Sequence, residues 1–310
     1  MKILVTGGAG FIASHISDFL ISMGNEVVIV DNLSTGKEKN INPRAKFIKM
    51  DICDAGLDKL FKEESFDIVN HHAAQIDVRH SVEDPLKDAR VNILGSINLL
   101  ENSVKYGVKK FIFASSGGVI YGEPVKLPAS EKDTACPISP YGASKYAVEV
   151  YLNYYNSIKG LKYSILRYGN VYGPRQDPHG EAGVVAIFIN ALLEGRVPVI
   201  YGGGEQLRDY VYIEDVVKAN VFAIESPRSN LLNIGTGVGT SVNKLFKSLT
   251  RLIPVEVSPG SGPRRDGEIQ KVYLDWKKAS EEIGWEPMVS MEEGLERTLA
   301  YFREERKIKA

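Results

Sequence analysis

The order of the first residues constrains the fold more than any other feature. An apolar run, Lys2–Thr6, leads directly into the glycine-rich loop Gly7–Gly10 and then into a segment with helical spacing. Strand-like and helix-like segments alternate from there to about residue 170. A parallel strand covered by helices on both faces is a continuous apolar run without polar alternation. The alternation therefore predicts an α/β fold with a Rossmann-type doubly wound parallel sheet.

The segments expected as strands are rich in Val, Ile and Phe, and they are 2–6, 26–31, 45–51, 67–70, 110–114 and 163–167. Helices are expected near 10–23, 55–63, 84–106 and 140–157. After about residue 172, shorter elements and Gly- and Pro-containing loops follow. We therefore expect a first domain, 1–171, and a smaller C-terminal α/β lobe, 172–310, partly interleaved with the main sheet. The site should lie at the carboxyl ends of the strands.

Composition excludes several classes of partner. The net charge of −1 gives no general attraction to nucleic acid or to an anionic membrane. No apolar run approaches the roughly 18 residues of a membrane span, and we expect no secretory leader. The two cysteines, Cys53 and Cys136, have no metal-ligand spacing, and neither do the histidines. We expect a cytoplasmic protein without a metal site, a disulfide framework or a nucleic-acid partner.

The glycine-rich loop predicts a dinucleotide site. Between a strand and a helix, Gly7 and Gly10 permit a tight turn and a close approach of the backbone to a pyrophosphate. Asp31 ends the second expected strand, where a carboxylate accepts from the adenosine ribose and repels a 2′-phosphate. This favours NAD over NADP. The alternatives are that Asp31 only caps the following turn, and that Lys37, the nearest cation, receives a phosphate.

Tyr141 and Lys145 predict proton transfer at the other end of this site. Four residues apart, they share one face of a helix that Ser139 can cap and Pro140 can begin. A neighbouring ammonium favours the phenolate and is expected to lower the pKa of Tyr141. The phenolate could take the proton of a sugar or alcohol hydroxyl while a nicotinamide takes the hydride.

Several further motifs join these two, and they are Thr6–Ala13, Asp31–Gly36, Asp51–Ile52, His72–Gln75, Val91–Gly95, Tyr141–Lys145, Arg167–Arg175 and Arg208–Tyr212. With them the chain resembles the extended short-chain dehydrogenase/reductase family in its nucleotide-sugar branch, most closely the UDP-glucose (UDP-galactose) 4-epimerases. The resemblance covers nearly the whole chain. It implies reversible epimerisation at C4 of a UDP-hexose through a 4-keto intermediate, with NAD retained and two chains in a homodimer.

The resemblance also implies which residues hold the cofactor. From the pyrophosphate through the adenosine to the nicotinamide they are Gly7, Gly10, Phe11, Ile12, Asp31, Asn32, Ser34, Thr35, Gly36, Asp51, Ile52, His72, Ala73, Ala74, Gln75, Asn92, Ser115, Tyr141, Lys145 and Tyr168. Asn92 matches a support position beneath the cofactor. Tyr168 matches a position near the carboxamide.

On the substrate side the matching residues are Ser116 and Gly117 at the sugar, Asn170, Arg208 and Arg265 at the diphosphate, and Val184, Val185, Val199, Tyr201 and Glu268 at the uridine. An arginine fork suits phosphate because it donates two parallel hydrogen bonds. The alternative for each arginine is a solvated surface charge.

Two positions depart from the family pattern. The third catalytic residue is commonly Ser or Thr four residues before the tyrosine of a Tyr-Gly turn, and that position is Gly117, before Tyr121. We expect Ser116 to take the role; the alternative is that a water or Tyr141 alone holds the sugar hydroxyl. The second position is Val272. Family members restricted to glucose and galactose have a large aromatic residue there, whereas those that also accept N-acetylated sugars have a small one. The small Val272 therefore predicts turnover of UDP-N-acetylhexosamines as well.

Other functions on the same fold remain open at this point. UDP-GlcNAc/GalNAc and UDP-uronate 4-epimerases differ only in residues of the sugar pocket. A 4,6-dehydratase needs an added acid and base where this chain has Gly117–Gly118. An NAD-dependent dehydrogenase of a small alcohol would not need arginines for a diphosphate. A non-catalytic protein that binds NAD or a nucleotide sugar would not need both Tyr141 and Lys145.

Overall fold

Seven parallel strands form the central sheet in the order β10-β6-β5-β4-β1-β2-β3. The computed structural model describes residues 1–179, 183–255, 257–264 and 268–309. The strands are β1 (Lys2–Thr6), β2 (Glu26–Asp31), β3 (Lys46–Lys49), β4 (Ile68–His71), β5 (Lys110–Ser116), β6 (Lys162–Tyr168) and β10 (Asn230–Ile234). The predicted doubly wound parallel sheet is confirmed.

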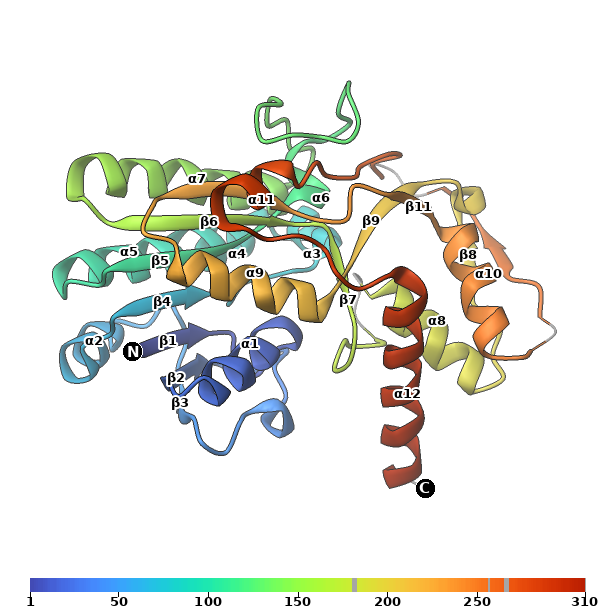
Figure 1. The fold of residues 1–310 in the computed structure, drawn as a ribbon, viewed down its shortest axis with the longest axis horizontal. Coiled ribbons are helices and arrows are strands. Elements are labelled where there is room, and N and C mark those ends of the chain that lie inside the picture. Colours follow the sequence, from blue (N-terminus) through green and yellow to red (C-terminus); the bar gives the residue numbers. More distant parts are fainter. Residues whose placement is uncertain (180–182, 256, 265–267, 310) are drawn as a thin grey trace.

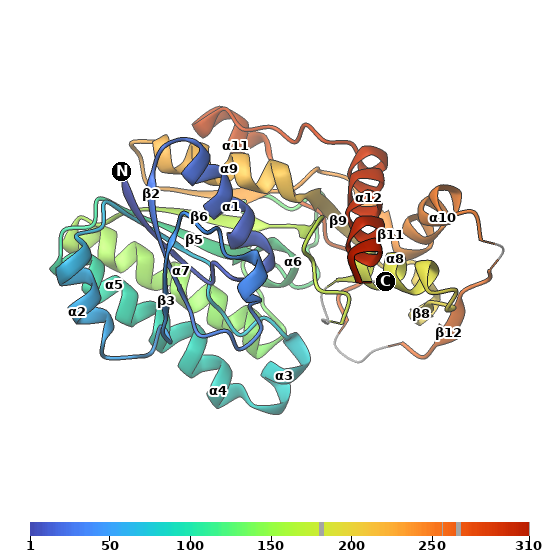
Figure 2. The same cartoon turned by 90° about the horizontal axis from the view of Figure 1, so that it is seen from below.

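Helices cover both faces of the sheet (Figures 1 and 2). One layer contains α1 (Phe11–Ser22), α9 (Ile213–Glu225) and α11 (Lys277–Ile283); the other contains α2 (Leu57–Glu64), α5 (Gly95–Lys105) and α7 (Pro140–Lys159). Successive strand side chains point to opposite faces. Ile3 and Val5 accordingly belong to the apolar cluster under α1 and α9, and Leu4 belongs to the cluster under α2, α5 and α7. Both faces are apolar, which explains the continuous apolar strands.

A smaller lobe follows β6 in the chain and lies beside the carboxyl ends of the sheet strands (Figure 1). It contains a three-stranded sheet of β7 (Asn170–Tyr172), β9 (Leu207–Tyr212) and β11 (Gly239–Ser241), and a pair of β8 (Val199–Tyr201) and β12 (Gly260–Gly262). Its helices are α8 (Val184–Leu193), α10 (Val242–Leu252) and α12 (Met291–Lys309). The chain returns to the main sheet with α9, β10 and α11, so the lobe is not a contiguous stretch of sequence.

The expected helix over 84–106 is interrupted. It consists of α4 (Pro85–Ala89), a π-helical turn η2 (Arg90–Leu94) and α5. The sequence pattern also did not predict α3 (Val78–Glu83), α6 (Gly117–Ile120), β7, β9, β11 or β12, which are short or lie beside loops. Short 3₁₀ turns, η1 (Glu38–Asn40) and η3 (Gly202–Gly204), complete the described elements.

The start of α7 agrees with its sequence signal. Ser139 Oγ accepts from Gly142 N at 3.1 Å, and Pro140 occupies the first turn. Among the described residues, no helix combines the length and apolar character that crossing a bilayer requires.

Candidate functional site

A cavity of about 740 Å³ lies at the carboxyl ends of the sheet strands. A volume in this range suits a cofactor-sized ligand. Every residue expected to hold the cofactor lines it except Asn92, which lies behind the wall. The other residues that line the cavity were not expected from the sequence: Ala13, Val30, Met50, Ile76, Asp77, Arg79, His80, Glu83, Lys87, Val91 and Ala114.

The glycine-rich loop is held tightly at the floor of this cavity. Gly7 has φ +71°, and a Cβ there would lie 2.8 Å from the backbone nitrogen of Ala73. Asp31 organises the loop, because its two carboxylate oxygens accept from Ala9 N at 3.0 Å and from Leu33 N at 2.8 Å. Asp31 therefore does stabilise the following turn, and it lines the cavity as well. The first amides of α1 have no carbonyl partner within the helix and suit a pyrophosphate.

His72, just after β4, and Tyr168, at the end of β6, form part of the wall, and β5 lies between their two strands in the sheet. The rings stack with centroids 6.0 Å apart, and His72 Nε2 lies 3.1 Å from the Tyr168 hydroxyl, which also accepts from Asn220 Nδ2 at 2.8 Å. Burial lowers the pKa of His72 to about 3, with the charge of Lys145 adding to the effect. The neutral ring leaves its buried Nδ1 without a partner among the described residues. A neutral wall with one unpartnered polar atom fits an uncharged polar group of a dinucleotide.

Tyr141 and Lys145 meet at the inner end of the cavity. Lys145 Nζ lies 5.8 Å from the centroid of the Tyr141 ring and donates to the carbonyl of Ala114 at 3.0 Å. This hydrogen bond and the ring of Phe113, whose centroid is 4.9 Å from Nζ, fix the position of the ammonium. The helix has therefore placed the two side chains on one face, as expected.

The expected direction of the Tyr141 pKa was wrong. Burial raises the pKa of Tyr141, and the negative charge of Asp88 raises it further. Burial also lowers the pKa of Lys145 to about 8, against the opposing charges of Asp88 and Glu149. Desolvation disfavours the charged form of each residue and is the largest cause of both pKa shifts.

Asn92 supports the cavity from behind. Its side chain accepts from Gln75 N at 2.8 Å and donates to Gln75 O at 3.0 Å, so it fixes the backbone of the segment that follows β4. Its contact with any bound ligand would be indirect.

The end of β5 explains why residue 117 is glycine. A Cβ at Gly117 would lie 2.5 Å from a methyl carbon of Leu274, so a Ser or Thr there would collide with a buried side chain. Ser115 Oγ is committed to Glu149 at 2.6 Å. Ser116 is partly exposed. A Cβ built on Gly118 would lie 3.8 Å from Ser116 Oγ and 3.6 Å from Asn170 Oδ1. Ser116 and Asn170 thus lie on the same side of the strand end.

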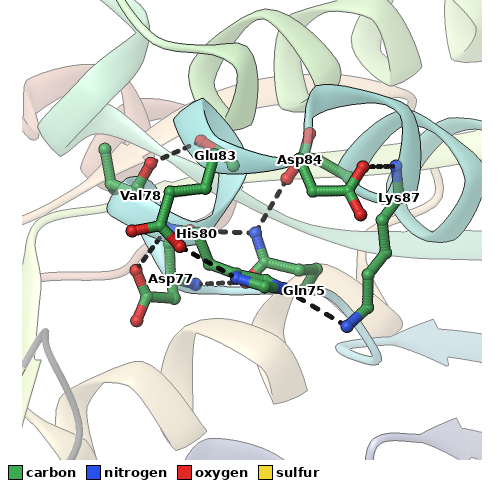
Figure 3. Close-up of polar contacts among 9 residues, drawn as sticks. Gln75, Asp77, Val78, His80, Glu83, Asp84 and Lys87 are labelled. Atoms are coloured by element: carbon green, nitrogen blue, oxygen red, sulfur yellow. Dashed lines mark hydrogen bonds and ion pairs between the residues drawn. The ribbon is translucent and has the colours of Figure 1, made fainter.

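The rim of the cavity carries a polar cluster on α3 and α4 (Figure 3). Asp77 caps α3 by accepting from His80 N at 2.9 Å. Lys87 Nζ lies 3.2 Å from His80 Nε2, and Glu83 lies 3.6 Å from His80 Nδ1. Gln75 donates to Asp77 O at 2.9 Å and so joins the rim to the wall. The short α3 has too few apolar positions for a sequence pattern to reveal this rim.

The expected substrate residues that the structure describes do not line this cavity. Arg208 and Glu268 lie together in the smaller lobe, with Nη2 and Oε1 3.8 Å apart and both side chains mostly buried. Burial lowers the pKa of Arg208. Gln206 Nε2 donates to Tyr201 O at 3.2 Å and lies 3.3 Å from Glu268 Oε1, which brings Tyr201 into the same group.

The remaining expected substrate residues are more scattered. Asn170 is on β7 and pairs with Tyr210 of β9, one strand from Arg208. Val184 and Val185 begin α8, where Val185 is buried, and Val199 is exposed at the start of β8. Arg265 lies outside the described residues.

Comparison with known proteins places this geometry in a family. The model of the NAD dependent epimerase/dehydratase family matches residues 3–235. The chain belongs to that family. It is 44% identical over 309 residues to the UDP-glucose 4-epimerase of Mycolicibacterium smegmatis, covering 98% of this chain and 99% of that protein.

Two solved structures are similar along the whole chain. The UDP-glucose 4-epimerase of Thermotoga maritima, crystallised with UDP-glucose, is 52% identical with a TM-score of 0.97 and covers 99% of this chain and 100% of that one. The UDP-glucose 4-epimerase of Thermus thermophilus, in complex with NAD, is 44% identical with a TM-score of 0.93 and covers 98% and 99%.

Proposed function

We propose that the protein is an isomerase that interconverts UDP-galactose and UDP-glucose by NAD-dependent epimerisation at C4. The observation that carries this function is the Tyr141–Lys145 pair at the inner end of the strand-end cavity, opposite the glycine-rich loop. The full-length similarity to UDP-glucose 4-epimerases supports the same reaction. A 4,6-dehydratase is not favoured, because Gly117 and Gly118 supply no acid or base.

We assign the proton transfer to Tyr141. Its phenolate takes the O4 proton of the sugar, and the phenol gives the proton back after the sugar has turned over. NAD, which the residues lining the strand-end cavity would hold, would supply the hydride acceptor and donor at C4 and a cationic ring that favours the phenolate. Lys145 adds a fixed positive charge next to the phenol. Ser116 orients the O4 hydroxyl from the end of β5.

Asn170, Arg208, Arg265 and Glu268 hold the UDP group in this proposal, with Val184, Val185, Val199 and Tyr201 around the uracil. Binding energy from this remote group keeps the loosely held 4-keto sugar within reach of Tyr141. The mostly buried position of Arg208 supports this role, because a guanidinium in low dielectric gains more from a phosphate than a solvated one does.

We also assign the cofactor-binding and proton-transfer roles to the first expected domain and the UDP-binding role to the second. Residues 1–171 carry the cofactor cavity and the Tyr141 helix, and residues 172–310 form the UDP-sugar lobe. The return of β10 to the main sheet supports their interleaving.

The working form is a cytoplasmic homodimer. Its support is an apolar face on α7, where Val150, Tyr151, Tyr154 and Ile158 are exposed by 53%, 40%, 47% and 66%. Such a face on a helix suits another copy of the chain.

The test uses purified protein, UDP-galactose or UDP-glucose, and no added NAD, with the products separated by chromatography. Interconversion supports a 4-epimerase with retained cofactor. No interconversion even after NAD is added would contradict the proposal.

A further inference from the structure

Asp88 is a fully buried carboxylate whose three hydrogen-bond donors are all neutral. Its Oδ1 accepts from Gln75 Nε2 at 3.0 Å and from Asn92 Nδ2 at 2.9 Å. Its Oδ2 accepts from Ser144 Oγ at 2.6 Å. A buried charge without a directly bonded cation is costly, and it persists where other interactions compensate. The position of Asp88 in α4 therefore calls for a physical reason.

The three donors connect the two sides of the candidate site. Gln75 lines the cavity, and Asn92 fixes the backbone of Gln75 from behind. Ser144 lies on α7 between Tyr141 and Lys145 in sequence. One carboxylate thus ties the cavity wall to the helix that carries the reactive pair.

We infer that Asp88 is a positioning residue for the Tyr141–Lys145 pair, fixing α7 against the cavity wall and supplying the buried counter-charge of the Lys145 ammonium. This inference rests on the proposed function for its catalytic meaning.

The electrostatics agree with this geometry. The charge of Asp88 raises the pKa of both Tyr141 and Lys145. Burial has already lowered the pKa of Lys145 to about 8, so further loss of negative charge would discharge the lysine near neutral pH. The charge of Glu149 also raises the pKa of Lys145, but Glu149 forms an ion pair with Arg167, in which Oε2 and Nη2 are 2.6 Å apart. Within the described part of the chain, Asp88 has no such bonded cation to neutralise its field.

Other titratable groups lie on the elements that pack against α4. Those of α7 are Tyr141, Lys145, Tyr146, Glu149, Tyr151, Tyr154, Tyr155 and Lys159. The others are Arg79, His80 and Glu83 of α3, Lys87 of α4 itself and Arg90 of η2. His80, Glu83 and Lys87 interact with one another at the rim. The experiment therefore changes Asp88 alone.

The first measurement is the pH dependence of kcat/KM for UDP-galactose in Asp88→Asn. The amide can keep all three bonds: its oxygen accepts from Gln75 and Asn92, and its nitrogen donates to Ser144 Oγ. Because the carboxylate raises both pKa values, its removal should move both limbs of the profile to lower pH, by about one unit. Asp88→Glu keeps the charge and should keep both limbs near their original pH.

The second measurement needs neither turnover nor cofactor. In the cofactor-free protein, the rate at which acetic anhydride acetylates Lys145 is followed against pH by peptide mass spectrometry. The midpoint for Lys145 should fall by about one unit in Asp88→Asn. This readout stands even if the UDP-hexose reaction is wrong, so failure of the inference and failure of the proposed function are distinguishable.

The matched control is Asp215→Asn. Asp215 is also fully buried and accepts from Met288 N and Val289 N at 3.1 and 3.0 Å, between α9 and the segment before α12. The Asp215→Asn variant should be less stable than the native protein. Neither limb of its pH profile of kcat/KM, nor the midpoint of Lys145 acetylation, should move. If Asp88→Asn does not fold, Asp88→Ser removes the charge and leaves room for water. Unchanged limbs and an unchanged Lys145 midpoint in a folded Asp88 variant would overturn the inference.

Discussion

The two halves of the candidate site differ in how the chain builds them. The cofactor half lies where five parallel strands, β1, β2, β4, β5 and β6, end at one edge of the sheet, and the expected residues there line a single cavity. The substrate half depends on β7, β9 and the start of α8, which lie outside the main sheet and are separated in sequence by other elements. Four of its expected residues form two groups, Ser116 with Asn170 and Arg208 with Glu268, and other expected residues are scattered over α8 and β8.

The difference between the two halves shows when a sequence motif also specifies the position of its residues in space. A motif at the end of a buried parallel strand has its position fixed by the sheet, because parallel strand ends meet at one edge. A motif in the smaller lobe is placed by tertiary packing that no local pattern encodes. The proposed division of labour is that the first half performs chemistry and the second half supplies binding energy.

The sharpest test of the chemical half is Tyr141→Phe, which removes the hydroxyl and keeps the ring. Epimerisation should fall by about 10²–10⁴-fold, the usual contribution of a positioned base. The loss should appear in kcat, measured with UDP-galactose at saturation, while bound NAD is released and quantified after denaturation.

NAD content close to that of the native protein is the required control for Tyr141→Phe. A variant that keeps activity within about tenfold of the native protein would remove Tyr141 from the role of base, because a general base contributes more than that.

The binding half is tested by Arg208→Met, which keeps the length of the side chain and removes the charge. Loss of a charge-assisted hydrogen bond costs about 1.5–3 kcal/mol, so KM should rise about 10–100-fold with a smaller change in kcat. Initial rates over a range of UDP-galactose concentrations separate the two constants. The matched control is Arg228→Met at an exposed position, for which both constants should stay near the native values.

A loss of kcat of about 10–100-fold in Arg208→Met, with no rise of KM, would contradict the proposed division of labour. It would place Arg208 in the half of the site that performs chemistry.

The junction of the two halves is tested at the end of β5. Ser116→Ala should lower kcat by about tenfold, if the serine only orients the hydroxyl that Tyr141 deprotonates. Adding Gly117→Ser should not restore the rate, because the new side chain would meet Leu274 at a distance that no real Cβ contact has. Overpacking should instead destabilise the protein by about 1–3 kcal/mol, measured by urea unfolding.

Recovery of native kcat in the Ser116→Ala, Gly117→Ser double variant would show that Leu274 yields and that residue 117 can hold the hydroxyl.

The sequence predicted most of the fold for physical reasons that are specific to each element. The continuous apolar runs predicted the strands of the main sheet, and the Ser139–Pro140 signal predicted the start of α7 to the residue. The pattern missed α3 because a six-residue helix at a cavity rim buries only Ser81. It merged α4, η2 and α5, because right-handed helical backbone continues through the π-helical turn, from Ala89 to Gly95, without a cap or a break.

The motifs predicted most of the residues that line the strand-end cavity, but they did not predict the electrostatics at its Tyr141 end. Spacing placed Lys145 beside Tyr141, but burial reversed the expected direction of the Tyr141 pKa. Burial depends on the packing of α3, α4 and α7 around the pair, which no motif reports. Gly117 was visible as a departure, yet its cause, Leu274, is distant in sequence and belongs to a small buried cluster.

The smallest expected effect concerns the sugar end of the binding half. Val272 is buried in the cluster with Leu274, and its nitrogen donates to Leu207 O at 3.1 Å, beside Arg208. With a small residue here, UDP-GlcNAc should be epimerised with kcat/KM lower than for UDP-galactose by about tenfold, the usual effect of a modest change in pocket fit. The same chromatographic assay measures both substrates. Val272→Tyr should widen the ratio, whereas Val238→Tyr at an exposed position should leave it unchanged. If UDP-GlcNAc is inert where UDP-galactose turns over readily, Val272 does not set the breadth of the pocket and the binding half is closed by other residues.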